Sequence, residues 1–251
     1  MLYFTDMAES LNIISWNVHY PRFAMDSGYV VDAIEKLGPF DVICLQEFVE
    51  GGDAKLHEWL DANDYNVTYL PFAHNLEGMS QGVMTATRKV LNAYVEPVVL
   101  RKDGPRNFRP FPNIRGLLKA TVKVDGESVV LMNFHSTYPR PHVIDMRQRE
   151  FAELKKLLEH QTDPWVLSGD FNFLSVDKRR KYLTDRYQSF TGGLISKTWR
   201  HHSKYTPVRG NLDYFFWSSD EFIVEPSLAP FEESDHRPLL AKISLQSSNN
   251  Q

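Results

Sequence analysis

Short apolar runs recur along the chain, and most of them end at a polar or charged residue. Each run has the length of a buried strand. The runs are LNIISWN (11–17), DVICLQE (41–47), VVLMNFH (129–135), WVLSGDFN (165–172) and LDYFFW (212–217), with SDHRPLL (234–240) before a last strand. The polar residues at their ends are Asn17, Glu47, His135, Asp170, Asn172, Asp213, Asp235 and His236. Because such groups are costly to bury unless they are paired or bound to an ion, the pattern predicts one shared polar site.

Helices and tight turns separate these strands. Apolar residues at helical spacing predict helices over 30–37, 54–63 and 142–160. The last helix is expected to be amphipathic, with an apolar face of Ile144, Phe151, Leu154 and Leu158. Asp125-Gly126 predicts a hairpin turn between two strands. Many hairpin-joined strands and few helices favour an α/β fold of two packed sheets with helices outside.

Length and composition are consistent with one such domain. The chain has 251 residues, of which 42% are hydrophobic, and we expect a single domain over residues 11–246. Residues 1–10 are expected to be flexible or non-native, and residues 247–251 a frayed end. The single cysteine, Cys44, lies in an apolar run and predicts a core residue in a reducing compartment. With no signal peptide and no membrane-spanning run, we expect a cytoplasmic monomer without an obligate protein partner.

Charge is distributed unevenly along the chain. The net charge is −4, yet two windows, 101–119 and 178–209, hold six and nine Lys or Arg residues against one acid each. Aromatic residues lie among these cations, a mixture that suits phosphate contacts and base stacking. A pair of solvated basic loops is an equally good interpretation.

The motifs resemble those of one enzyme superfamily. WN at 16–17, LQE at 45–47, RGLLKA at 115–120, NFHS at 133–136, SGDFN at 168–172, NLDYFFW at 211–217 and SDHRPLL at 234–240 occur in the order found there. On these motifs the chain resembles the endonuclease/exonuclease/phosphatase superfamily. That group includes pancreatic-type deoxyribonucleases, apurinic-site endonucleases, tyrosyl-DNA phosphodiesterases, inositol-phosphate phosphatases and neutral sphingomyelinases. The chain looks most like small bacterial members of unassigned substrate. The resemblance implies a four-layer α/β/β/α sandwich, in which helices flank two mixed β-sheets.

The resemblance also implies a divalent metal site. Glu47 ends an apolar strand and matches the main Mg²⁺ ligand of the family, with Mn²⁺ as an alternative metal. Asn17 matches the asparagine that helps hold this site, and Asp235 is expected on its metal or water side. A surface carboxylate and a capping asparagine are the alternatives. His19 departs from the family pattern, because many relatives have Asp or Gly there.

Catalytic roles follow in the same way. Asp170 and Asn172 are two apart, so extended backbone would point them to one side. By resemblance Asp170 activates water, and Asn172 can donate to a phosphate oxygen; an Asx turn over 169–172 is the alternative. Adjacent residues diverge in a strand, so Asp235 cannot orient His236. By resemblance Asp213 does so.

Substrate contacts are expected around the second family histidine. His135 matches the histidine that contacts the scissile phosphate or assists the leaving oxygen. Arg115 resembles a recurrent family arginine, although a salt-bridged arginine at a sheet edge is equally plausible. The loop TYPRPH (137–142) follows His135 closely, and the second basic window begins soon after SGDFN. The remaining candidate contacts are Tyr138, Arg140, Lys178 and Arg179.

Together these residues predict metal-assisted, in-line hydrolysis of a phosphate ester by water, without a covalent nucleophile. The first hypothesis is a Mg²⁺- or Mn²⁺-dependent nuclease or phosphodiesterase acting on nucleic acid. The second is a phosphatase or phosphodiesterase for a small or lipid phosphate, of the inositol phosphate or sphingomyelin type. The third is a catalytically silent relative that binds RNA or protein, and the complete set of acidic and imidazole residues argues against it.

Overall fold

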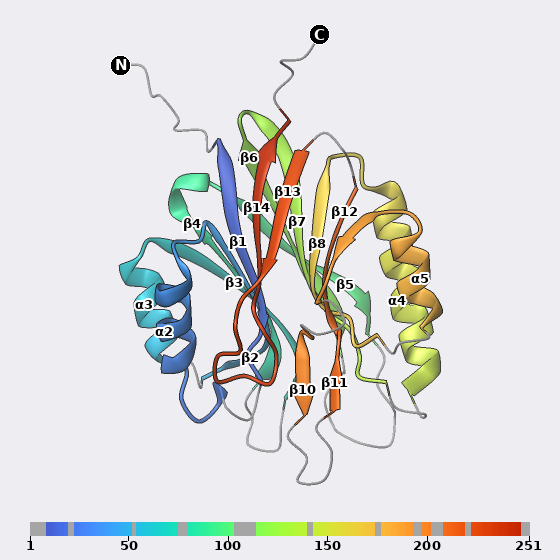
Figure 1. Ribbon diagram of the computed structural model, residues 1–251, viewed down its shortest axis with the longest axis horizontal. Coiled ribbons are helices and arrows are strands. Elements are labelled where there is room, and N and C mark those ends of the chain that lie inside the picture. Colours follow the sequence, from blue (N-terminus) through green and yellow to red (C-terminus); the bar gives the residue numbers. More distant parts are fainter. Residues whose placement is uncertain are drawn as a thin grey trace.

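Two β-sheets form the centre of the molecule (Figure 1). The computed structural model describes residues 9–19, 23–51, 54–74, 80–102, 114–139, 143–173, 177–192, 197–201, 208–218 and 222–246. The first sheet has the order β13 (Phe222–Leu228), β14 (Leu239–Leu245), β1 (Ser10–Asn17), β2 (Val42–Glu50), β4 (Ser80–Arg88), β3 (Tyr65–His74). The second has the order β5 (Tyr94–Arg101), β6 (Arg115–Val124), β7 (Glu127–His135), β8 (Trp165–Asp170), β12 (Asp213–Trp217), β9 (Gln188–Phe190). A separate ribbon pairs β10 (Trp199–His201) with β11 (Val208–Gly210).

Each sheet contains one parallel pair among antiparallel neighbours. β1 and β2 run parallel and are connected through α2 (Gly28–Leu37), and β7 and β8 run parallel and are connected through α4 (Ile144–His160). α2 and α3 (Ala54–Ala62) cover one outer face, and α4 and α5 (Lys178–Thr184) cover the other (Figure 1). A short 3-10 turn, η1 (Lys89–Leu91), joins β4 to β5. The predicted four-layer α/β/β/α sandwich of two mixed sheets is therefore confirmed.

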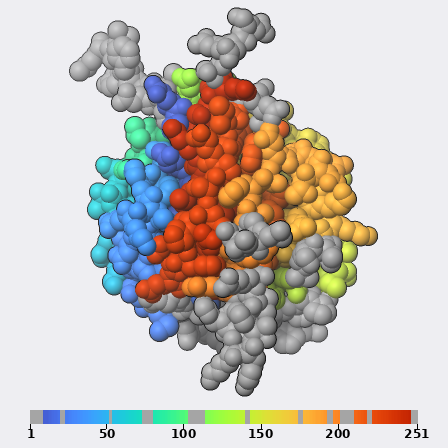
Figure 2. Space-filling model, viewed as in Figure 1, coloured from blue at the N-terminus to red at the C-terminus, as the bar shows by residue number. Residues whose placement is uncertain are grey.

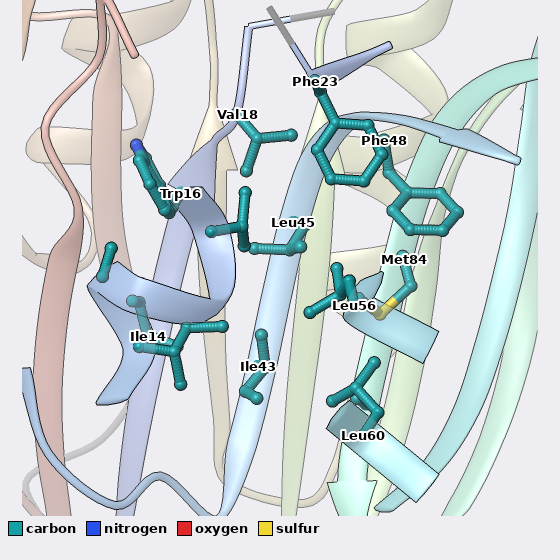
Figure 3. Packing of buried hydrophobic residues seen from close by; sticks show 14 of the residues in the cluster. Ile14, Trp16, Val18, Phe23, Ile43, Leu45, Phe48, Leu56, Leu60 and Met84 are labelled. Atoms are coloured by element: carbon teal, nitrogen blue, oxygen red, sulfur yellow. The ribbon is translucent and has the colours of Figure 1, made fainter. Parts of the chain in front are cut away.

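Three apolar layers follow from alternation along the strands. On β1, Leu11 and Ile13 face the second sheet, whereas Ile14 and Trp16 face α2 and α3. Figure 3 shows this helix-side layer, in which Ile43 lies between Ile14 on one side and Leu56 and Leu60 of α3 on the other. A third layer separates the second sheet from α4 and α5. Cys44 lies buried between the sheets, as expected of a core residue.

The C-terminal segment joins the two halves of the molecule. In the space-filling view, residues 222–246 (red) lie on the surface between the early helices (blue) and the region around α5 (orange) (Figure 2). This arrangement follows from the pairing of β14 with β1, which places the last strand beside the first. Residues from both ends of the chain can therefore contribute to one site.

The amphipathic helix differs from its prediction at its start. Leu154 and Leu158 are buried as expected, but Ile144 is 54% exposed, so its assignment to the apolar face is wrong. Arg147 and Glu150 are buried in this part of the helix instead, at 4% and 1% exposure. The first turns of α4 extend past the apolar layer and meet polar loops.

The space between the sheets becomes polar toward one end. Gln46 and Asn133, both buried, join the two sheets through a 2.8 Å bond from Gln46 Nε2 to Asn133 Oδ1. Asn133 Nδ2 in turn donates to the Met84 carbonyl at 2.8 Å. These bonds satisfy the Asn133 amide and the Gln46 Nε2, although Gln46 Oε1 has no hydrogen-bond partner among the described residues, and they link the two sheets across the interior. The polar strand ends lie directly beyond this layer.

Gly169, in the SGDFN motif, cannot carry a side chain. Its φ is +138°, and an added Cβ would lie 1.8 Å from the Phe134 carbonyl oxygen of the neighbouring strand. We expect Gly169→Ala to lower the free energy of unfolding by about 3 kcal/mol or more, from the contact and the strained φ together. In thermal denaturation the melting temperature should fall by roughly 6–12 °C.

The variant Gly38→Ala separates the effect of the strained φ from the effect of the contact with Phe134. Gly38 has a φ of +124°, but no described atom beyond its chain neighbours lies within 4 Å of an added Cβ there. The strained φ acts alone at this position, and we expect a loss of about 1 kcal/mol. Equal losses for the two variants would contradict a role for the contact with Phe134.

Candidate active site

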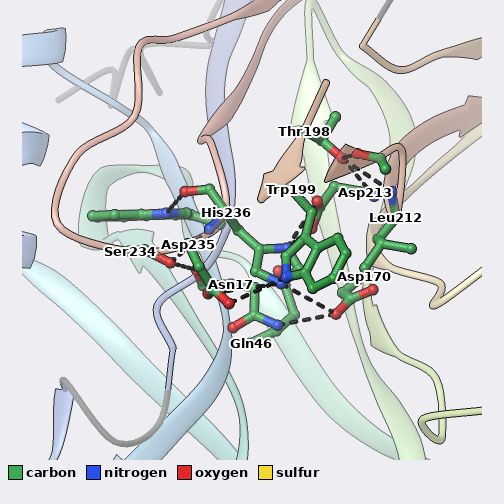
Figure 4. Close-up of polar contacts among 12 residues, drawn as sticks. Asn17, Gln46, Asp170, Thr198, Trp199, Leu212, Asp213, Ser234, Asp235 and His236 are labelled. Atoms are coloured by element: carbon green, nitrogen blue, oxygen red, sulfur yellow. Dashed lines mark hydrogen bonds and ion pairs between the residues drawn. The ribbon is translucent and has the colours of Figure 1, made fainter. Parts of the chain in front are cut away.

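The polar strand ends converge at one end of the sandwich. Asn17 and His135 end β1 and β7, and Asp170 ends β8. The carboxyl ends of the parallel strands thus lie at the same edge, where ligand sites of open sheets are commonly found. Asp213 begins the antiparallel neighbour of β8, opposite Asp170. Figure 4 shows Asn17, Asp170, Asp213, Asp235 and His236 together.

A β-bulge brings Glu47 into this group. The pairing of β2 with β4 shifts register between Gln46 and Phe48, and Glu47 has a φ of +57°. A bulge re-aims the side chain it contains. As a result Glu47 Oε1 accepts a bond of 3.3 Å from Asn17 Nδ2, although its neighbours Gln46 and Phe48 are buried.

Asn17 connects two carboxylates. Its Nδ2 also donates to Asp170 Oδ2 at 3.0 Å. His135 Nε2 lies 3.6 Å from the same Asp170 oxygen, and His236 Nε2 lies 4.0 Å from it. Asp170 therefore stands at the centre, between one amide and two imidazoles.

Burial and charge shift the pKa values of this central group. Burial raises the pKa of Asp170, and the balance of attraction by His236 and repulsion by Asp213 and Glu47 leaves it at about 7. Burial holds the pKa of His135 well below its ordinary value, and the positive charges of Arg115 and His236 lower it further. His135 is therefore neutral at pH 7, and Asp170 can take up a proton near neutral pH.

Asp213 orients His236. His236 Nδ1 lies 3.0 and 2.9 Å from the two Asp213 carboxylate oxygens. Burial lowers the pKa of His236, but the charges of Asp213, Asp170 and Asp235 and the bond to Asp213 outweigh it and raise this pKa to about 10. His236 therefore carries a proton on both ring nitrogens at pH 7. Asp235 makes no hydrogen bond to the His236 ring among the described residues, although its Oδ1 lies 4.0 Å from Nε2 and its charge acts on that ring.

We expect Asp213→Asn to lower the pKa of His236 toward or below neutral pH, because the largest opposing charge is lost while burial remains. An NMR titration of the His236 ring checks this. The raised pKa also stabilises the folded protein: this contribution is complete below about pH 6.5 and is lost as the pH rises through about 10. In Asp213→Asn the free energy of unfolding should not fall over this pH range. An unchanged His236 pKa in the variant would contradict the assignment.

Two hydroxyl side chains hold the backbone of Asp213 and His236 in place. Thr198 Oγ1 accepts the backbone N–H groups of Leu212 and Asp213 at 3.0 and 3.2 Å. Ser234 Oγ donates to the Asn17 carbonyl at 2.7 Å and accepts the His236 N–H at 3.0 Å. Ser234 lies in the SDH motif, so the sequence carried a signal for it. Thr198 lies in no motif that we identified.

The residues present fit a divalent cation. In the part of the chain that the structure describes, Asp235 Oδ1 is buried and has no hydrogen-bond partner, while Trp199 Nε1 donates to Oδ2 at 3.1 Å. Glu47 and Asp170 share the amide nitrogen of Asn17, which concentrates negative charge. Carboxylate and amide oxygens are hard donors of the kind that Mg²⁺ prefers.

Donor atoms of Asp170, Asp213 and His236 also lie within 4.8 Å of one another, as in a metal site. Both oxygens of Asp213 already lie within 3.0 Å of His236 Nδ1, however. We therefore interpret this trio as a hydrogen-bonded relay, with cation ligands on the Glu47 side of Asp170.

The Asx turn that was the alternative for residues 169–172 is present, with Asp170 as the accepting side chain and Asn172 as the donor. The Asn172 N–H donates to Asp170 Oδ1 at 2.8 Å, and the φ of Asn172 is +50°. Its side-chain Nδ2 donates to the Ser136 carbonyl at 3.0 Å. Asn172 thus ties the loop after β8 to the loop after β7, and its expected contact with phosphate stays a prediction.

The expected substrate contacts differ in their surroundings. Arg115 Nε donates to Thr137 Oγ1 at 3.2 Å, and its guanidinium lies 4.8 Å from the Phe72 ring centre. Tyr138, which follows Thr137 in the chain, is 56% exposed. Arg179 is bound to Asp177 at the start of α5, Lys178 is exposed, and Arg140 lies outside the described residues.

Several cations of the two basic windows are engaged within the protein. Lys119 pairs with Glu96 at 3.5 Å, and Lys181 pairs with Asp185 at 2.7 Å. Arg186 lies 4.0 Å from the Tyr182 ring centre. Residues 103–113 and 202–207, which hold other cations of these windows, lie outside the described residues. A continuous basic surface therefore stays a prediction.

Comparisons with known proteins identify relatives of this arrangement. A sequence model described as "Endonuclease/Exonuclease/phosphatase family" matches residues 14–236. No curated protein matches the sequence. No described helix is long and apolar enough to cross a membrane.

Solved structures share the fold at low sequence identity. An endonuclease/exonuclease/phosphatase from Beutenbergia cavernae has a TM-score of 0.70 and 21% identity, over 94% of this chain and 72% of that one. The human Nocturnin catalytic domain with bound sulfate has a TM-score of 0.69 and 17% identity, over 96% of each chain. TDP2 from D. rerio, complexed with a single-stranded DNA product, has a TM-score of 0.68 and 18% identity, over 94% of this chain and 99% of that one.

Proposed function

This chain belongs to the endonuclease/exonuclease/phosphatase family, whose members hydrolyse phosphate esters, and from that premise we propose that it is a Mg²⁺- or Mn²⁺-dependent phosphodiesterase that cleaves nucleic acid. The observation that carries the proposal is the position of Asp170. Its carboxylate lies between the Asn17 amide and the imidazoles of His135 and His236, with Glu47 beside it. These groups suit in-line attack of water on a phosphate.

The metal would be held by Glu47, with the unbonded oxygen of Asp235 as a further ligand. Asn17 would contribute through Oδ1, which here accepts the His19 N–H at 3.0 Å, because its Nδ2 donates to Glu47 and Asp170. When bound, it supplies a positive charge that polarises the phosphoryl group and offsets charge on the leaving oxygen. Glu47 lies in a bulge of a rigid strand, so its carboxylate is held in place before the substrate arrives.

Asp170 accepts the proton of the attacking water. Its pKa of about 7 is close to the working pH, which is where a general base is most effective. The Asn172 N–H bond to Oδ1 leaves Oδ2 as the oxygen that faces Asn17 and the imidazoles. Asp170 Oδ2 thus orients the water, while Asp170 Oδ1 is fixed by the Asn172 N–H.

The two histidines act on the phosphate in different protonation states. His236, protonated and held by Asp213, donates a charged hydrogen bond from Nε2 to a phosphoryl oxygen and so stabilises the charge of the transition state. Neutral His135, whose Nε2 lies 3.6 Å from the same Asp170 oxygen, orients the phosphate as a second contact. No side chain needs to form a covalent bond with phosphorus.

A nucleic-acid substrate is supported by the family membership and by the basic windows of the sequence. One solved relative of the same fold, D. rerio TDP2, carries a single-stranded DNA product. The test is incubation of the purified protein with single- and double-stranded DNA and RNA, with Mg²⁺ or Mn²⁺ and with chelator. Cleavage that chelator abolishes is expected, and no cleavage of any of these polymers would exclude the nuclease proposal.

A small or lipid phosphate is the second candidate substrate. It is favoured by the pairing of Lys119, Arg179 and Lys181 with nearby acids, which leaves these cations less available to a polyanion. Release of inorganic phosphate or phosphocholine from inositol phosphates or sphingomyelin, in the absence of nucleic-acid cleavage, would establish this alternative. Binding of RNA with no hydrolysis of any substrate would instead indicate a silent relative.

A further inference from the structure

Two oppositely charged side chains are buried at the start of α4. Arg147 and Glu150 are 4% and 1% exposed and lie three residues apart, on one face of the helix. Burial of charged groups is costly unless their hydrogen bonds are satisfied. Their partners are therefore informative about their role.

Arg147 binds the loop that follows β8. Its Nη2 donates to the Asn172 carbonyl at 2.9 Å and lies 3.8 Å from Oδ2 of Asp177, the residue that caps α5. Its Nε has no hydrogen-bond partner among the described residues. Asn172 is held in a left-handed conformation, and its own N–H donates to Asp170 Oδ1 at 2.8 Å. A non-glycine residue in this conformation needs support from its surroundings. The Arg147 bond supplies that support at the same residue whose N–H contacts Asp170.

Glu150 binds the loop that follows β7. Its two carboxylate oxygens accept the Thr137 N–H at 3.0 Å and the Thr137 hydroxyl at 2.6 Å. The Thr137 Oγ1 in turn accepts the bond from Arg115 Nε at 3.2 Å. Glu150 therefore fixes a loop that begins directly after His135 and orients the Arg115 side chain through Thr137.

The two loops are also bonded to each other. Asn172 Nδ2 donates to the Ser136 carbonyl at 3.0 Å, and the Ser136 N–H donates to the Asp170 carbonyl at 2.8 Å. Movement of either loop would therefore displace the other. One helix face restrains both of them, from the outer side of the second sheet (Figure 1).

We infer that Arg147 and Glu150 form a clamp: two positioning residues that hold the loops after β7 and β8, and thereby Asp170, His135 and Arg115, in reactive geometry. Neither residue needs to touch the substrate. The kinetic part of this inference rests on the proposed function, because it requires a measurable hydrolysis. The structural part does not.

The test combines amide hydrogen exchange with steady-state kinetics. Arg147→Met removes the donors while keeping an unbranched, flexible apolar stem, and Arg147→Lys keeps the charge. In Arg147→Met we expect faster exchange confined to residues 135–139 and 170–173 and to 177–179, where Asp177 loses its ion pair with Arg147. We also expect kcat to fall by roughly 10–100-fold with little change in KM, as loss of alignment without loss of binding predicts. Arg147→Lys should recover part of kcat.

Thr137→Val tests the second arm of the clamp without removing a buried charge. It deletes the hydroxyl between Glu150 and Arg115 but leaves the backbone bond to Glu150 available. We expect a smaller fall in kcat, with exchange of the Thr137 amide unchanged. The control is Leu158→Ala, a buried position three turns farther along α4. It should lower stability without changing kcat per folded molecule.

The outcomes separate the two proposals. If the wild-type protein hydrolyses no phosphate ester, the proposed function fails, and the exchange experiment alone decides whether the clamp exists. Wild-type exchange in both loops of Arg147→Met, or a change spread over the domain as in Leu158→Ala, would overturn the clamp. Wild-type kcat in Arg147→Met and Thr137→Val would overturn its role in the reaction.

Discussion

Asp170→Asn is expected to reduce kcat by about 10²–10⁴-fold, the range associated with loss of a general base. The amide cannot accept the proton of the attacking water. It also cannot reproduce both present contacts, because one oxygen accepts from the Asn172 N–H and the other from Asn17 Nδ2. The measurement is single-turnover hydrolysis of the best substrate from the panel, at saturating protein and Mg²⁺.

The control for this variant is Asp185→Asn, the same chemical change at an exposed residue that pairs with Lys181. It should leave kcat unchanged. Melting temperatures of both variants must be compared, and Asp170→Asn should remain folded, because its buried carboxylate is electrostatically unfavourable in the absence of a cation. Turnover of Asp170→Asn within a few-fold of wild type would show that Asp170 is not the base.

Glu47→Gln is expected to weaken metal binding and to lower kcat/KM by about 10²-fold or more, since a carboxylate ligand contributes several kcal/mol to a hard-cation site. The effect should differ in kind from that of Asp170→Asn. Raising the Mg²⁺ or Mn²⁺ concentration should recover part of the activity, because the catalytic base is intact. Calorimetric titration of the metal into each protein measures the affinity independently of turnover.

Glu50→Gln is the matched control for Glu47→Gln. Glu50 lies three residues farther along β2 and is exposed, so loss of its charge should change neither metal affinity nor kcat. Chelator should inactivate the wild type and the control equally, and added metal should restore both. Equal metal affinity in Glu47→Gln and the wild type would remove Glu47 from the site.

Local patterns in the sequence predicted much of the fold. The short apolar runs of β1 and β8, the Asp125-Gly126 turn and the amphipathic spacing of α4 are properties of neighbouring residues. The two-sheet arrangement follows from the number of such strands, and the four layers from the family resemblance. The strands β9, β10 and β11 were missed, because segments of three residues are too short to show a period.

Polar strand ends identified most of the candidate site for the same local reason. A buried strand that closes with an uncompensated polar group requires a partner, and the sequence shows that requirement without showing the partner. Asn17, Asp170 and His236 were therefore recognisable before their mutual contacts were known. The Asx turn at Asn172 was likewise predictable as an alternative, because it depends on residues two apart.

The sequence by itself thus determined which strands form, which of their ends are polar and which family motifs they carry, because these depend on residues close together in the chain. Only the tertiary structure decided the bulge that turns Glu47 toward Asn17, the bond from the Asp213 N–H to Thr198, and the burial of Arg147 and Glu150 against two loops. The physical reason is that a charged side chain is stabilised by whichever group the fold brings within about 3 Å, and sequence separation does not limit that choice.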